Sequence, residues 1–122
     1  MKEVLFVWKG LNCMTEMYSA LRAEVPAPCD ERTLLNAGLL RTLKESSEIL
    51  VCGQALSHCV NFTVRDLADT YQMGDVDRLG TISILSDCTS SVPGFEEAGT
   101  AFLADMKRKG LRIVTTESWT FV

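Results

Sequence analysis

The sequence predicts an α/β protein: a three-layer, Rossmann-like fold in which helices flank a parallel sheet of about four strands. Strand-like and helix-like stretches alternate along the chain, which is the pattern of parallel strands joined by crossover helices. The strand-like stretches are continuously apolar, as in sheets that are covered on both faces. The 122 residues, 47% of them hydrophobic, suffice for a single domain with a substantial core.

The first half of the chain predicts two strands with a helix between them. The first strand is the apolar run over residues 3–8, and an irregular stretch with two prolines follows over residues 10–28. Leucines at three- and four-residue spacing predict a helix over residues 33–46, which Asp30 or Thr33 could cap. The apolar residues 49–52 predict the second strand.

The second half repeats the alternation. Apolar residues at helical spacing predict a helix over residues 59–72, and a polar loop follows over residues 74–80. A third strand over residues 81–85 precedes a helix over residues 96–109, which Gly110 ends. Residues 111–115 predict the last strand.

Cys59 stands where the second strand gives way to a helix. A thiol at a helix start is exposed to free N–H groups and to the positive end of the helix dipole, and both favour the nucleophilic thiolate. Crossover handedness brings the carboxyl ends of parallel strands to one edge of the sheet. We therefore expect Lys9, residues 53–59 and residues 87–91 to gather at that edge.

Composition excludes several classes of function. The net charge of -4 argues against a nucleic-acid-binding surface, and no apolar run is long enough to span a membrane. Five cysteines without CxxC spacing argue against a disulfide scaffold and a zinc ribbon, and favour a cytoplasmic protein. The single histidine, His58, has no acidic cluster beside it, so we expect no metal and no cofactor.

Four segments resemble the isochorismatase-like cysteine hydrolases, a family best known for nicotinamidases. The most specific is Gly53-Gln54-Ala55-Leu56-Ser57-His58-Cys59-Val60, continuing to Asp66. The others follow the family's order and together cover nearly the whole chain: Trp8-Lys9-Gly10 with residues 18–26, residues 87–96, and Ala98-Gly99 with residues 106–110.

The resemblance implies hydrolysis of a carbon–nitrogen bond in a small non-peptide amide. For this chain we expect no cofactor and a homo-oligomer, a dimer or larger. It places the nucleophile on Cys59, which forms a thioester, and the family's lysine on Lys9, whose charge favours the thiolate. It implies a cis peptide bond between Gln54 and Ala55. The N–H groups of Ala55 and Cys59 are then the expected oxyanion hole.

The chain departs from the family in one large respect. Relative to the family it starts at the third strand, so the family's aspartate and first two strands have no counterpart before Lys9. Asp30, Asp66 and Asp87 are substitutes by residue type only; we expect Asp66 to pair with a surface base and Asp87 to lie near the site. For the sheet we expect one of two repairs: residues 3–8 pair directly with residues 49–52, or a second copy lends structure.

Other side chains near these motifs have two interpretations. Trp8, Tyr18, His58 and Asp87 could line a pocket, although core packing or a loop role explains them equally well. Ser57 is expected to cap the helix that begins at Cys59. His58 is not expected to act as the base, because neighbouring residues at a helix start point in different directions.

Three functions remain open. The first is an amide hydrolase, which requires a carboxylate within hydrogen-bond reach of Cys59. The second is a catalytically inactive relative that serves as an oligomeric binding module, and it predicts no such carboxylate. The third is a redox-sensing protein, which requires a second thiol close to Cys59.

Overall fold

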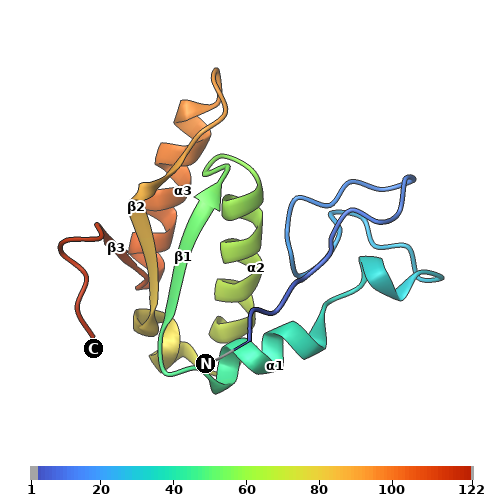
Figure 1. Ribbon diagram of the computed structural model, residues 1–122, viewed down its shortest axis with the longest axis horizontal. Helices are drawn as coiled ribbons and strands as arrows, with labels where there is room; N and C mark the ends of the chain where they lie inside the picture. The colour runs from blue at the N-terminus through green and yellow to red at the C-terminus, as the bar shows by residue number, and fades with distance from the viewer. Residues whose placement is uncertain (1–2, 122) are drawn as a thin grey trace.

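The computed structural model describes residues 3–121 and contains a parallel sheet flanked by helices (Figure 1). Its three strands, β1 (Ile49–Gln54), β2 (Ile82–Ser90) and β3 (Arg112–Val114), lie side by side in that order. The helices are α1 (Ala37–Glu45), α2 (Cys59–Gln72) and α3 (Glu96–Lys109), with 3₁₀ helices η1 (Glu31–Thr33) and η2 (Val76–Thr81). The predicted α/β class with a parallel sheet is confirmed.

One face of the sheet carries the core. The register places Ile49 beside Ile82, and Val51 beside Ile84 and Ile113, so these apolar side chains share a face. The central helices α2 and α3 pack on them through fully buried residues that include Val64, Phe102 and Met106. On β1 the alternate residues Leu50 and Cys52 are exposed instead.

The helix ends follow from local chemistry. The expected helix over residues 33–46 begins only at Ala37, because Asn36 accepts a hydrogen bond from the Leu39 N–H at 3.0 Å and so caps α1 there. Residues 31–33 form the separate turn η1, which the carboxylate of Asp30 caps. At the other end of the chain, α3 stops at Gly110, whose φ of 104° suits glycine.

The predicted first strand is wrong. Residues 3–8 form no strand, and none of them hydrogen bonds to another described residue. Their large side chains stand in solvent: Phe6 and Trp8 are each 79% exposed. The apolar composition favours a strand, but a strand also needs a hydrogen-bonding partner, and β1 pairs with β2 alone among the described strands. The expected direct pairing with residues 49–52 is therefore absent.

The ladder between β1 and β2 is interrupted. It pairs Val51 with Ile84 and then Gly53 with Thr89, so β1 advances two residues while β2 advances five. The intervening part of β2 begins at Leu85, which pairs with Val114 on β3. This irregularity carries Asp87 away from β1, and it resembles a bulge in its effect.

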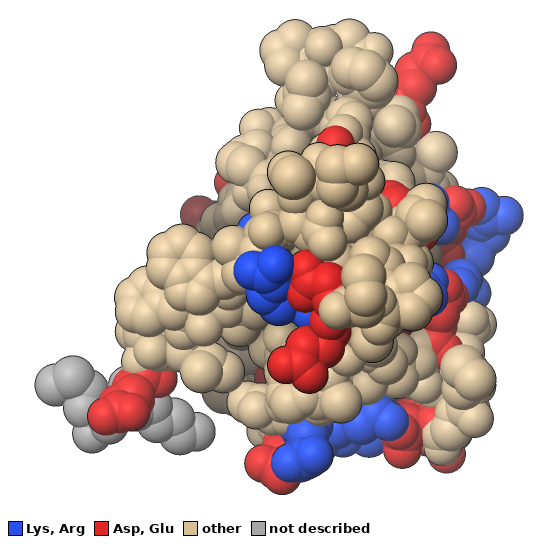
Figure 2. Space-filling view, turned by 90° about the vertical axis from the view of Figure 1, so that its right-hand side faces the viewer, with Lys and Arg blue, Asp and Glu red and all other residues tan. Residues whose placement is uncertain are grey.

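Charged side chains are mixed in sign over the surface. On the face shown in Figure 2, acidic and basic groups lie close together in several places, with wide uncharged areas between them. Ion pairs such as Arg22 with Asp66, at 3.2 Å, account for part of this mixing. Among the residues the structure describes, no helix is both long enough and apolar enough to span a membrane.

Candidate active site

Cys59 is the first residue of α2, just beyond the carboxyl end of β1. The loop between them is held against the neighbouring strand, because the Leu56 N–H donates to the Ser90 carbonyl at 2.8 Å. Cys59 is partly exposed at the N-terminus of α2, so a small molecule can approach it.

Lys9, near the N-terminus of the chain, contacts this sulfur. Its Nζ lies 3.6 Å from Cys59 Sγ and donates a second hydrogen bond to the Met17 carbonyl at 3.0 Å. The structure thus brings together the two residues singled out from the sequence, fifty positions apart. The role of Met17 could not be found from a pattern, because a backbone carbonyl carries no sequence signal.

Two backbone N–H groups beside Cys59 are uncommitted. The peptide bond between Gln54 and Ala55 is cis, as the resemblance implies. The Ala55 carbonyl accepts from His58 N–H and Val60 N–H, at 3.1 and 3.0 Å. Neither the Ala55 N–H nor the Cys59 N–H donates to any other described residue, so both can bind a ligand oxygen.

Ser57 does not cap α2, contrary to expectation. The N-cap residue is His58, and it makes no side-chain capping bond. The buried Ser57 hydroxyl instead accepts from the Val92 N–H at 3.0 Å and lies 2.8 Å from His58 Nδ1. It therefore ties the loop before Cys59 to the loop after β2, and it engages one ring nitrogen of His58.

Aromatic rings surround His58. The ring centroids of Tyr18 and Phe95 lie 5.2 and 4.9 Å from that of His58, and Phe62 lies 5.3 Å from Tyr18. Two of the expected pocket residues, Tyr18 and His58, are thus in contact. Phe95 was not among the predicted pocket residues, although its place in the segment 87–96 indicates that it lies near the site.

None of the candidate carboxylates binds Cys59 or Lys9. Arg32 donates to Asp30 and holds the pKa of that carboxyl well below its usual range. Asp66 pairs with Arg22 on the surface. Asp87, expected near the site, accepts from the hydroxyl and N–H of Thr116, which lower its pKa. Within residues 3–121, therefore, no carboxylate is hydrogen-bonded to the sulfur.

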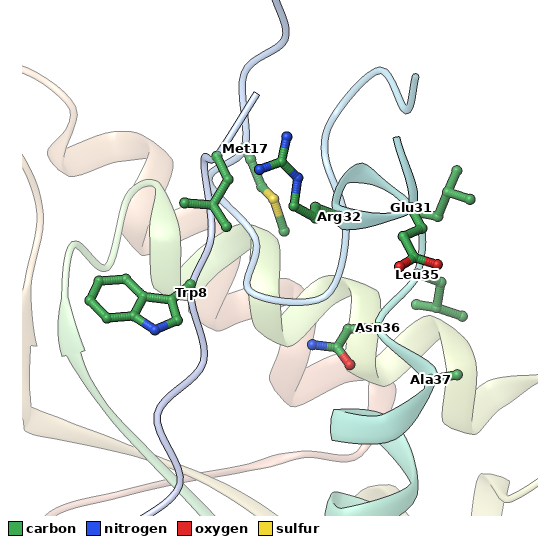
Figure 3. A pocket seen from close by; sticks show the side chains of 9 residues that line it. Trp8, Met17, Glu31, Arg32, Leu35, Asn36 and Ala37 are labelled. Atoms are coloured by element: carbon green, nitrogen blue, oxygen red, sulfur yellow. The ribbon is translucent and has the colours of Figure 1, made fainter. Parts of the chain in front are cut away.

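Trp8 lies at a different hollow. A pocket of about 410 Å³ opens between Trp8 on the N-terminal stretch and residues 31–37, with Met17 and Arg32 on its wall (Figure 3). Neither Lys9 nor Cys59 lines it. Met17 connects the two places, because its side chain faces the pocket and its carbonyl holds Lys9.

The described residues contain no group of three or more His, Cys, Asp or Glu side chains that could hold a metal ion. All five cysteines are free thiols, and none hydrogen bonds to Cys59. Comparison of the chain with protein-family models, with curated proteins and with solved structures found no significant match.

Proposed function

We propose that the chain is an isochorismatase-like cysteine hydrolase that cleaves the carbon–nitrogen bond of a small non-peptide amide. The observation that carries the proposal is the 3.6 Å contact between Lys9 Nζ and Cys59 Sγ at the N-terminus of α2. Two uncommitted N–H groups beside the sulfur support it. The free cysteines suit a reducing compartment, so we propose a cytoplasmic location.

In the proposed reaction the Cys59 thiolate attacks the carbonyl carbon of the amide. A C–S bond forms, and the oxyanion accepts hydrogen bonds from the N–H groups of Ala55 and Cys59. The C–N bond then breaks, and the nitrogen takes up a proton from solvent and leaves as ammonia. Water cleaves the remaining thioester, which releases the acid and restores the thiol. The positive charge of Lys9 stabilises the anionic sulfur before the C–S bond forms and after it breaks.

A second candidate is a catalytically inactive relative that acts as a binding module. The observation that favours it is the engagement of Asp30, Asp66 and Asp87 elsewhere. No described carboxylate hydrogen bonds to Lys9 Nζ or Cys59 Sγ, where an acid for the leaving nitrogen would be expected.

The first test is the rate at which iodoacetamide alkylates Cys59 at neutral pH, followed by peptide mass spectrometry. Lys9→Ala should slow Cys59 by about fivefold to tenfold, because one unit charge near 4 Å in a solvated site contributes on the order of 1 kcal/mol. Cys13 and Cys29 are exposed and serve as internal controls whose rates should stay unchanged.

The outcome separates the two candidates. A slower Cys59 in Lys9→Ala, together with ammonia release from small primary amides that Cys59→Ser abolishes, supports the hydrolase. Equal Cys59 rates in wild type and Lys9→Ala would mean that the lysine has no electrostatic role, and the binding module would then be preferred.

A further inference from the structure

Two parts of the molecule are suited to β-pairing and pair with no strand within residues 3–121. The first is the outer edge of β1, whose sequence Ile-Leu-Val-Cys-Gly-Gln contains neither a charge nor a proline. Natural edge strands often carry charges or prolines that prevent further pairing. The edge of β1 has neither.

The second part is the extended stretch over residues 3–8. It contains five consecutive apolar residues from Val4 to Trp8, yet its backbone hydrogen bonds to no other described residue. Val4, Leu5 and Phe6 are 76%, 65% and 79% exposed. β-branched and aromatic residues of this kind favour a strand, and apolar residues in succession suit one that is covered on both faces.

We propose that two copies of the chain associate by exchanging these parts, so that residues 3–8 of each copy add as a strand to the β1 edge of the other. With one two-fold axis between the copies, the β1 edge and the segment 3–8 of each copy all gain hydrogen-bonding partners, because each chain carries both an unpaired edge and an unpaired strand-like segment. A foreign partner that added one strand to β1 would leave residues 3–8 exposed. The exchange does not depend on amide hydrolysis.

The hinge for this exchange lies next to the candidate site. Residues 3–8 are followed by Lys9, whose amine donates to the Met17 carbonyl and to Cys59 Sγ. In the exchange, residues 3–8 turn about the backbone between Trp8 and Lys9, so the Lys9 amine keeps these contacts.

Association is measured by sedimentation equilibrium over a concentration series. The wild type should reach twice the mass of one chain, and Phe6→Lys should raise the dissociation constant about tenfold or more, because it removes one large apolar side chain from each exchanged strand. Met73→Lys is the matched control: Met73 is 90% exposed and lies at the end of α2, so the same change there should leave association unaltered.

Cross-linking tests the pairing itself. In Val7→Cys, a short bis-maleimide should join residue 7 to Cys52, which is exposed on β1, and the product should have double mass. The link should vanish in Val7→Cys with Cys52→Ser. A wild type that stays monomeric at every concentration, an equal effect of Met73→Lys, or a 7–52 link found only at single mass would each overturn the proposal.

Discussion

Two regions of the molecule are held together in different ways: the half that contains the sheet, and the N-terminal stretch over residues 3–30. The sheet half buries Ile82, Ile84 and Phe102 completely in one apolar cluster. The N-terminal stretch lacks regular structure. It is held by polar contacts, such as Ala20 N–H with Thr63 Oγ1 at 2.9 Å, and by Leu21, which is buried in the same apolar cluster. The candidate site lies between them: the core positions Cys59, whereas loop contacts position Lys9.

The sharpest test of this difference compares two phenylalanines. Phe102→Ala should lower the free energy of unfolding by about 3–5 kcal/mol, because it leaves a cavity in the core. Phe6→Ala, at a side chain 79% exposed, should change it by no more than about 0.5 kcal/mol in the monomer. Urea unfolding of dilute protein measures both. Similar losses for the two variants would mean that residues 3–8 pack in a way the structure does not have.

A pair of glycines tests how closely the site is packed against the core. A Cβ at Gly99 would clash with Ser91 Oγ and lie 3.3 Å from Leu56 Cδ2. Gly99→Ala should therefore destabilise by about 1 kcal/mol net, since overpacking costs about 1–3 kcal/mol and the helix preference of alanine recovers about 1 kcal/mol. It should also slow Cys59 alkylation by shifting the loop at Leu56.

Gly38 is the control for this substitution. A Cβ there meets nothing closer than Asn36 Oδ1 at 3.7 Å. Gly38→Ala in α1 should stabilise by up to about 1 kcal/mol, with alkylation unchanged. Thermal unfolding of the two variants should thus give shifts of opposite sign. Shifts of the same sign would show that the close approach at Gly99 does not constrain the helix.

Acid should loosen the N-terminal stretch through Asp30. Its pKa is lowered in the folded protein, chiefly by the Arg32 side chain, and Asn12 also donates to it at 3.1 Å. A lowered pKa stabilises the fold above the unfolded-state value of about 3.9 and ceases to do so as pH falls through the folded-state value. Asp30→Asn should therefore be less stable than wild type at neutral pH, and the difference should shrink below about pH 4.

Urea midpoints at neutral and acidic pH measure this difference. Asp77→Asn is the control, because Asp77 forms no ion pair within residues 3–121. A difference between wild type and Asp30→Asn that stays constant with pH would rule out ionisation of Asp30 as the source of the stabilisation.

Local pattern predicted the parts of the fold that depend on local chemistry. The helices over residues 59–72 and 96–109 are confirmed to the residue, since each has apolar spacing that meets a packed face. The strand over residues 3–8 was wrong because pairing is decided by distant residues, which composition does not report. The helix over residues 33–46 began too early because the capping role of Asn36 was not recognised.

The candidate site was likewise predicted from the sequence only in part. Lys9 and Cys59 were singled out from motifs, and the structure places them 3.6 Å apart. Asp87 was expected near them because it follows a strand, but the interrupted ladder carries it to Thr116 instead. Serine before a helix predicts a cap, whereas the Ser57 hydroxyl accepts from the Val92 N–H in a loop distant in sequence.

The interruption in the ladder also makes the position of one wall of the site less dependent on the regular pairing of the strands. Beyond it, Ser90 and Val92 hold the loop that carries Cys59, through the Leu56 N–H and the Ser57 hydroxyl. The part of β2 from Ser86 to Cys88 acts as a spacer between this anchoring point and the regular part of the sheet. Lengthening or shortening that spacer by one residue would shift Ser90 against Gln54 and so move one wall of the site, while the pairs from Ile49 to Val51 and the ladder to β3 stayed in register. The dimensions of the site can therefore vary through insertions there, independently of the sheet that supports it.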